Sequence, residues 1–149
     1  MIVDETVDYH LRSTLFTMRR MYNLMAQEFG ITQGIGYALI NIGEEGIPAT
    51  KIAPLMGMTS SSLSRMLKNM EDNGYIFRKQ DLEDRRVVRI FLSFDGRALK
   101  KKIEDVVLDF NTKLLKRLSK NEIKAFEKVN SIIKEEAKSE IEKLKLTQP

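Results

Sequence analysis

The sequence contains no cysteine and only one histidine, His10. Without cysteine the chain cannot form a disulfide, a thiolate zinc site or a thiol-based redox switch. It also has no glycine-rich phosphate loop, no cluster of metal ligands and no nucleophile elbow. We therefore expect no enzymatic activity, no metal and no cofactor, and we assign His10 to the surface or to an interface between chains.

Long apolar runs are absent as well, and none approaches the roughly 20 residues that a membrane-spanning helix requires. The first ten residues, MIVDETVDYH, lack the basic start and apolar centre of a signal peptide. We therefore expect a cytoplasmic protein without a membrane span. A length of 149 residues suits one domain. The net charge of +4 is a mild bias, so the placement of the charges matters more than their sum.

Apolar residues recur every three or four positions along the first 29 residues, which predicts an amphipathic helix of about six turns. Thr32 is placed to cap a shorter second helix, which ends before the turn at residues 43–46. Gly34 and Gly36 lie inside that second helix, where each costs roughly 1 kcal/mol relative to alanine. Either the packing there is close or the helix is loose.

Residues 50–73 predict two short helices joined by a turn. Gly57 suits a turn that requires a positive φ, and Ala53 is small enough for the two helices to cross closely. Pro54 removes a backbone donor from the first of these helices, so we expect that helix to be short or bent. Thr59 is placed to cap the second.

The second helix of this pair has two different faces. Its apolar face, which includes Leu63 and Leu67, suits the core, whereas its outer face is polar and cationic. A helix of this kind fits the major groove of DNA. Arg65 is suited to a bidentate contact with guanine and Lys68 to a phosphate, while Ser60 can equally serve only to begin the helix. The candidate DNA-binding residues here are Ser60, Ser61, Ser62, Ser64, Arg65, Lys68 and Asn69.

Residues 75–80 and 87–93 are rich in β-branched and aromatic side chains and predict a β-hairpin. Its polar loop carries Arg85 and Arg86, and Arg89 is expected to project from the returning strand. Arginines in this position can enter the narrow minor groove. Asp84 is expected to pair with one of the arginines and to fix its direction.

The segment DLEDRRVVRIFLSFDGRAL, residues 81–99, resembles the wing signature of the multiple-antibiotic-resistance regulator (MarR) family of bacterial winged-helix transcription factors. Asp84 and Arg86 match the Asp and Arg of the signature, which the resemblance implies brace the wing and reach the minor groove. Pro54 and Leu82 depart from the family pattern, but neither lies on the reading face.

The resemblance implies a mainly α-helical fold with a small β-hairpin wing. A single domain would span residues 1–149, with a winged helix-turn-helix lobe over 31–96 and long dimerisation helices over 1–30 and 97–149. Ser119, with Glu122 three residues later, predicts the break between the last two helices. A monomer would expose the apolar faces of these helices, so we predict a symmetric homodimer. The alternative is that they fold back onto their own chain.

Together these features predict a homodimeric regulator that binds double-stranded DNA and acts as a ligand-responsive repressor. The alternative is a winged-helix module that binds another protein. The resemblance also implies a pocket for a small aromatic or phenolic effector between the dimerisation helices and the DNA-binding lobe. The residues selected for that pocket are Tyr9, Phe16, Met21, Tyr37 and Ile40.

Overall fold

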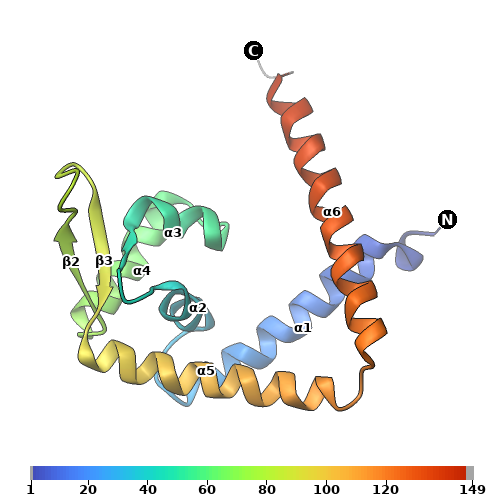
Figure 1. Cartoon of the computed structure of the whole chain (residues 1–149), viewed down its shortest axis with the longest axis horizontal. Helices are drawn as coiled ribbons and strands as arrows, with labels where there is room; N and C mark the ends of the chain where they lie inside the picture. The colour runs from blue at the N-terminus through green and yellow to red at the C-terminus, as the bar shows by residue number, and fades with distance from the viewer. Residues whose placement is uncertain (1, 147–149) are drawn as a thin grey trace. The chain divides into compact units, whose positions relative to one another are not determined.

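A computed structural model describes residues 2–146 and confirms a mainly helical protein with a small antiparallel sheet. The chain divides into two compact units, Met1–Val107 and Leu108–Pro149. Figure 1 shows the order of the elements. The helices are η1 (Val3–Glu5), α1 (Val7–Gln27), α2 (Gln33–Asn41), α3 (Ala49–Met56), α4 (Ser60–Asp72), α5 (Phe94–Leu115) and α6 (Lys120–Leu146), and the strands are β1 (Ile47–Pro48), β2 (Ile76–Gln80) and β3 (Val88–Leu92).

Threonine caps begin three helices of the first unit, α1, α2 and α4. The Thr32 hydroxyl accepts a hydrogen bond from the Ile35 amide at the start of α2, and Thr59 does the same for the Ser62 amide at the start of α4. Both caps were predicted from the sequence. Thr6, which caps α1 by accepting from the Tyr9 amide, was not.

Helices α3 and α4 form the predicted helix-turn-helix. Gly57 ends α3 with a φ of +60°, the left-handed conformation that this turn requires. Pro54 lies within α3, and because it has no N–H it leaves the carbonyl of Thr50 without its usual helical partner. The helix is only eight residues long, so the expectation of a short helix is confirmed.

The wing contains one strand that the sequence did not reveal. Strands β2 and β3 pair as the predicted hairpin, with Arg78 opposite Ile90, and β1 adds to the other edge of β3 to give the order β1-β3-β2. Figure 1 shows the hairpin extending from the start of α5, with its loop at the far end. Gly46, just before β1, has a φ of +67°, and its Cα packs against Phe91 and the carbonyl of Ile90.

The core of the first unit joins helices α2, α3 and α4 to the sheet. Its fully buried large side chains come from successive elements and the segments beside them: Leu39, Ile42, Ile52, Met70 and Ile90. Gly36 is buried in α2, and a Cβ added there would lie 3.5 Å from Cγ2 of Ile103 in α5. That is an ordinary van der Waals contact, so the packing around Gly36 leaves room for a methyl group.

The second unit contains the end of α5 and all of α6. The Ser119 hydroxyl accepts from the Glu122 amide, and the Glu122 carboxylate accepts from the Ser119 amide at 2.7 Å, so the predicted capping box is present. Leu118 lies between the two helices, because α5 ends at Leu115 and α6 begins at Lys120. None of the residues of α6 is buried.

Candidate nucleic-acid interface

Helix α4 separates an apolar face from a polar one. Leu63, Leu67 and Met70 are buried against the core, and Met66 is half-buried. The predicted reading residues of this helix all lie on exposed positions: Ser60, Ser61, Ser62, Ser64, Arg65, Lys68 and Asn69. The lobe therefore presents a continuous polar helical surface to solvent.

The hydroxyl groups at the start of α4 form a local network. The Thr59 hydroxyl donates to the Ser62 hydroxyl at 3.0 Å and lies 3.2 Å from the Ser61 hydroxyl. The Ser64 hydroxyl donates to the carbonyl of Ser60 at 2.9 Å. The Ser64 hydroxyl therefore donates within the helix, but its oxygen can still accept a hydrogen bond from a ligand. The free amides of the first turn add partial positive charge at this end.

The two cationic side chains of α4, Lys68 and Arg65, differ in their contacts. The Lys68 ammonium pairs with the Asp72 carboxylate one turn later at 3.1 Å, and both side chains are largely exposed. An exposed pair of this kind contributes only about 0.3–0.5 kcal/mol, so Lys68 can exchange Asp72 for a phosphate at little cost. Arg65 has no ion pair or hydrogen bond within residues 2–146 through its side chain, which leaves its five donors available.

The wing loop exposes Arg85 and Arg86 at its end. The Asp84 carboxylate accepts from the Arg86 backbone amide at 3.0 Å and pairs with the Arg86 guanidinium at 3.1 Å. These contacts hold the pKa of Asp84 below its ordinary value. The expected Asp84–arginine pair is thus present. The Arg86 side chain remains 91% exposed, and the neighbouring Leu82 is fully exposed.

Arg89 does not project from β3, contrary to the expectation from the sequence. Its guanidinium pairs with the Asp81 carboxylate at 3.1 Å and donates to the carbonyls of Glu45 and Gly46. Its side chain is only 26% exposed. Outward projection was inferred from the position of Arg89 in the strand, but a carboxylate and two turn carbonyls lie within its reach.

The importance of Asp81 was missed in the sequence. Its carboxylate accepts from the backbone amides of Glu83 and Asp84, and these hydrogen bonds, with the contribution of Arg89, hold its pKa below the ordinary value. An aspartate directly after a strand, followed by a polar loop, is typical of such a turn and could have indicated this role. The ion pair between Arg78 and Glu71 at 3.1 Å, which links β2 to α4, was also not predicted.

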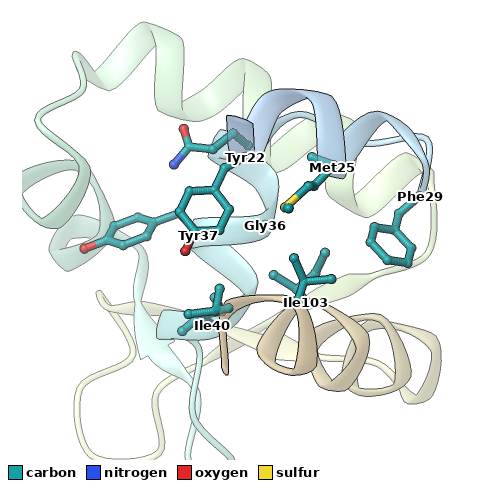
Figure 2. Close-up of a pocket in the computed structure, with 11 residues that line it drawn as sticks. Tyr22, Met25, Phe29, Gly36, Tyr37, Ile40 and Ile103 are labelled. Carbon is teal, nitrogen blue, oxygen red and sulfur yellow. The ribbon is translucent and has the colours of Figure 1, made fainter. Parts of the chain in front are cut away.

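A second candidate site is a cavity of about 260 Å³ between α1, α2 and α5. Figure 2 shows Tyr22 and Met25 of α1, and Phe29 in the turn that follows, facing Ile40 of α2 and Ile103 of α5 across it. No charged side chain is among its lining residues, which are Tyr22, Met25, Ala26, Phe29, Gln33, Gly36, Tyr37, Ile40, Ile103, Val106 and Val107. Burial raises the pKa of Tyr22 above its ordinary value.

Two of the five residues selected for an effector pocket line this cavity. Tyr37 and Ile40 line it, as selected, but Tyr9, Phe16 and Met21 do not. Tyr9 and Phe16 lie on exposed positions of α1, and the Tyr9 ring contacts the ring of His10 instead. The cavity lies along the later turns of α1, more than a turn beyond Tyr9 and Phe16, whereas Met21 directly precedes the lining residue Tyr22 but is not itself part of the lining. Helical periodicity alone does not indicate which residues of a helix face a cavity.

Residues 39–88 match the model of the MarR family. The matched segment runs from the end of α2 through the helix-turn-helix to the wing loop. The winged helix-turn-helix of this chain is therefore similar to that of the MarR family. The matched segment includes the whole polar face of α4 and the wing arginines Arg85 and Arg86.

Two curated proteins that resemble this chain are transcriptional regulators. The chain is 36% identical over 90 residues to the organic hydroperoxide resistance transcriptional regulator of Bacillus subtilis (strain 168), which covers 60% of this chain and 61% of that protein. It is 38% identical over 61 residues to the HTH-type transcriptional regulator TtmR of Methylorubrum extorquens (strain PA1), which covers 41% of this chain and 31% of that protein. The chain thus matches less than two thirds of the length of either relative.

Solved structures of MarR-family proteins share the fold. The MepR–DNA complex of S. aureus superposes with a TM-score of 0.82 at 21% identity, covering 91% of this chain and 99% of MepR. A structure of MarR gives a TM-score of 0.74 at 24% identity, covering 96% of this chain and 98% of that one. At these identities the likeness concerns the fold.

Residues 2–146, which the structure describes, contain neither a cluster of metal ligands nor a membrane-spanning helix. Among those residues no group of three or more histidine, aspartate or glutamate side chains is close enough to hold a metal ion. Within the same residues, no helix combines the length and the apolar character needed to cross a membrane.

Proposed function

We propose that this chain is a sequence-specific regulator of transcription that binds double-stranded DNA as a homodimer in the cytoplasm. The observation that carries the proposal is the exposed polar face of α4, on which Arg65 has its donors available while the opposite face is buried in the core. A helix anchored on one side and polar on the other can enter the major groove without losing its packing. No catalytic role is assigned.

Each cationic side chain receives a distinct role. Arg65 reads a guanine through paired hydrogen bonds, whereas Lys68 leaves Asp72 to bind a phosphate. Arg85 and Arg86 enter the minor groove from the wing, with Asp84 orienting Arg86. The serines at the start of α4 and Asn69 contact the DNA backbone or base edges beside Arg65.

The dimer in this proposal is formed by residues 1–30 and 97–149, and residues 31–96 form the DNA-binding lobe. Support comes from apolar side chains that a soluble monomer would leave in water. Leu15 and Phe16 in α1 are more than half exposed, and so are Phe126, Ile141 and Leu144 in α6. Two-fold pairing would place two α4 helices in successive major grooves, about 34 Å apart. Sedimentation of the purified chain tests this directly, and a monomer at micromolar concentration would contradict it.

The direction of regulation is proposed to be repression. A dimer bound across an operator excludes other proteins from the same DNA, and a signal that changes the spacing of the two α4 helices releases it, because both half-sites must be engaged for tight binding. The names of both relatives as transcriptional regulators support a regulatory role, and the MepR–DNA complex supports DNA as the partner of this fold.

The cavity between α1, α2 and α5 is the proposed effector site. Its volume of about 260 Å³ suits a ligand with one aromatic ring rather than a large drug. Because none of its lining side chains is charged, an anionic ligand would lose its hydration without gaining a counter-charge. We therefore expect uncharged aromatic or phenolic molecules to bind more tightly than their carboxylate analogues.

Selection of bound fragments from the source genome tests the DNA-binding proposal. We expect enrichment of a pseudo-palindromic site, with binding that weakens steeply as salt rises, since phosphate contacts release counterions. Failure to retain any duplex at low salt would refute the proposal and favour a winged-helix module for protein partners.

Calorimetry with matched pairs of ligands tests the effector proposal. Phenol and benzoate at neutral pH have similar size but differ in charge, and the phenol should bind more tightly. The variant Gly36→Val, which adds a branched side chain to the cavity wall, should weaken binding while the chain stays folded. Preferential binding of benzoate, or unchanged affinity in the variant, would place the effector elsewhere.

A further inference from the structure

Asp81 sits at the base of the wing loop and organises its backbone. One carboxylate oxygen accepts from the amides of Glu83 and Asp84, at 2.9 and 3.2 Å. The other oxygen accepts from the guanidinium of Arg89 at 3.1 Å. The side chain of Asp81 is only 17% exposed. The shape of the loop therefore depends on a carboxylate whose second oxygen is held by β3.

Arg89 joins this loop to a distant turn. Its Nε donates to the carbonyl of Glu45 at 3.2 Å, and its Nη2 donates to the carbonyls of Glu45 and Gly46 at 2.9 and 3.1 Å. With the Asp81 contact, the guanidinium makes four hydrogen bonds to groups that precede β1 and follow β2. A guanidinium has five N–H donors, so few remain for any other ligand.

The acceptors on the turn are themselves fixed. Gly46 has a φ of +67°, and any Cβ there would lie 2.7 Å from the Phe91 ring and 2.8 Å from the carbonyl of Ile90. The amide of Gly46 also donates to the carbonyl of Gly43 at 3.1 Å. The two carbonyls that Arg89 binds therefore belong to a tight turn packed against β3, which is a rigid support for the wing.

We propose that Arg89 is a positioning residue for DNA recognition: it fixes the wing loop against the turn at residues 43–46 and does not itself contact DNA. The proposal rests on the proposed function. The connection runs from the turn through Arg89 to Asp81, then to the amide of Asp84, whose carboxylate holds Arg86. The β2–β3 hairpin pairs with only two residues of β1, so side-chain contacts supply the remaining restraint on its direction.

A double-mutant cycle separates positioning from direct contact. The probe is a duplex recovered from the genomic selection, and the variants are Arg86→Ala, Arg89→Met and the two together. Loss of one charge-assisted contact lowers DNA affinity about tenfold, so we expect each single variant to bind about tenfold more weakly than the unaltered chain. If Arg89 acts through Arg86, the double variant will bind DNA as tightly as whichever single variant has the lower affinity. Additive losses, about a hundredfold together, would overturn the proposal.

Arg89→Lys and Lys101→Met complete the set. Lysine keeps the charge but cannot reach Asp81 and both carbonyls at once, so we expect it to bind DNA as poorly as Arg89→Met. Restoration of affinity by lysine would indicate a simple phosphate contact and overturn the proposal. Lys101 in α5 pairs with Asp105 at 2.7 Å, and Lys101→Met removes the same net charge outside the wing. The Lys101→Met variant should bind DNA within about twofold of the unaltered chain, since an exposed ion pair contributes little to stability.

Hydrogen exchange of the protein without DNA gives an independent measurement. The amides of Glu83 and Asp84 should exchange faster in Arg89→Lys than in the unaltered chain, while the amides of α4 keep their protection. Unchanged exchange at these two amides would overturn the proposal, whatever happens with DNA. If the unaltered chain binds no duplex, the proposed function fails, but the exchange result still decides whether Arg89 restrains the loop.

Discussion

Gly96→Ala is the substitution for which the structure makes the sharpest prediction about stability. Gly96 is the third residue of α5 and is buried. Its Cα packs directly on the backbone of Tyr75, at the base of β2. A Cβ on Gly96 would overlap the carbonyl oxygen of Tyr75 and lie 2.9 Å from its carbonyl carbon. That oxygen also accepts a hydrogen bond from the Ser93 amide at 3.0 Å, so it cannot move without cost.

The magnitude follows from two opposing effects. Replacing glycine by alanine inside a helix stabilises it by about 1 kcal/mol. Overlap with fixed backbone costs typically about 1–3 kcal/mol and more when the neighbour cannot shift. Because the neighbour here is a hydrogen-bonded carbonyl, we expect the steric cost to dominate. The free energy of unfolding should fall by about 2 kcal/mol.

Gly36→Ala is the matched control, since it makes the same change inside another helix. A Cβ at Gly36 would meet Cγ2 of Ile103 at 3.5 Å and Cδ1 of Ile31 at 3.8 Å, which are ordinary contacts. Only the helix preference then remains, so this variant should gain up to about 1 kcal/mol. The two variants should therefore shift stability in opposite directions.

Urea unfolding followed by circular dichroism measures both variants. The comparison requires one protein concentration throughout, because association would make stability depend on concentration. A Gly96→Ala variant as stable as the unaltered chain would refute the steric argument, and equal shifts in the two variants would show that the neighbours of each glycine do not matter.

Four further outcomes are expected. Arg65→Ala should relax the sequence preference at one base pair, with a loss of about 1–3 kcal/mol of discrimination that footprinting measures. Lys68→Ala should instead lower the slope of log affinity against log salt concentration by about one unit, which a salt titration measures. Folding lowers the pKa of Asp81 from 3.8, so its carboxylate stabilises the protein above that pH, and this stabilisation is lost as the pH falls through the lowered pKa. The free energy of unfolding of Asp81→Asn should therefore fall less steeply with decreasing pH below pH 4. Ser119→Ala removes the capping box of α6 and should cost about 1 kcal/mol in thermal or urea unfolding, with Glu122→Gln as a milder comparison.

Local patterns in the sequence were sufficient to predict the six α-helices, three of their caps and the hairpin. Thr32, Thr59 and Ser119 each stand where a side-chain oxygen reaches an amide two or three residues later, and such contacts involve only neighbouring positions. The faces of α4 followed from its periodicity for the same reason, because positions three and four apart share one side of a helix.

Contacts between distant segments were decided by the tertiary structure. The two residues of β1 are too few to give a pattern, and they become a strand only because β3 offers its free edge. Arg89 finds its partners 43 and 44 positions away, so its direction could not be read from the strand that carries it. The cavity combines α1, α2 and α5, and only the packing of these helices determines which of their turns face it. The sequence thus determined which surfaces are polar and where the α-helices and the β2–β3 hairpin form, since both depend on neighbouring residues. Strand β1, the partners of Arg89 and the walls of the cavity depend instead on how the chain folds back on itself.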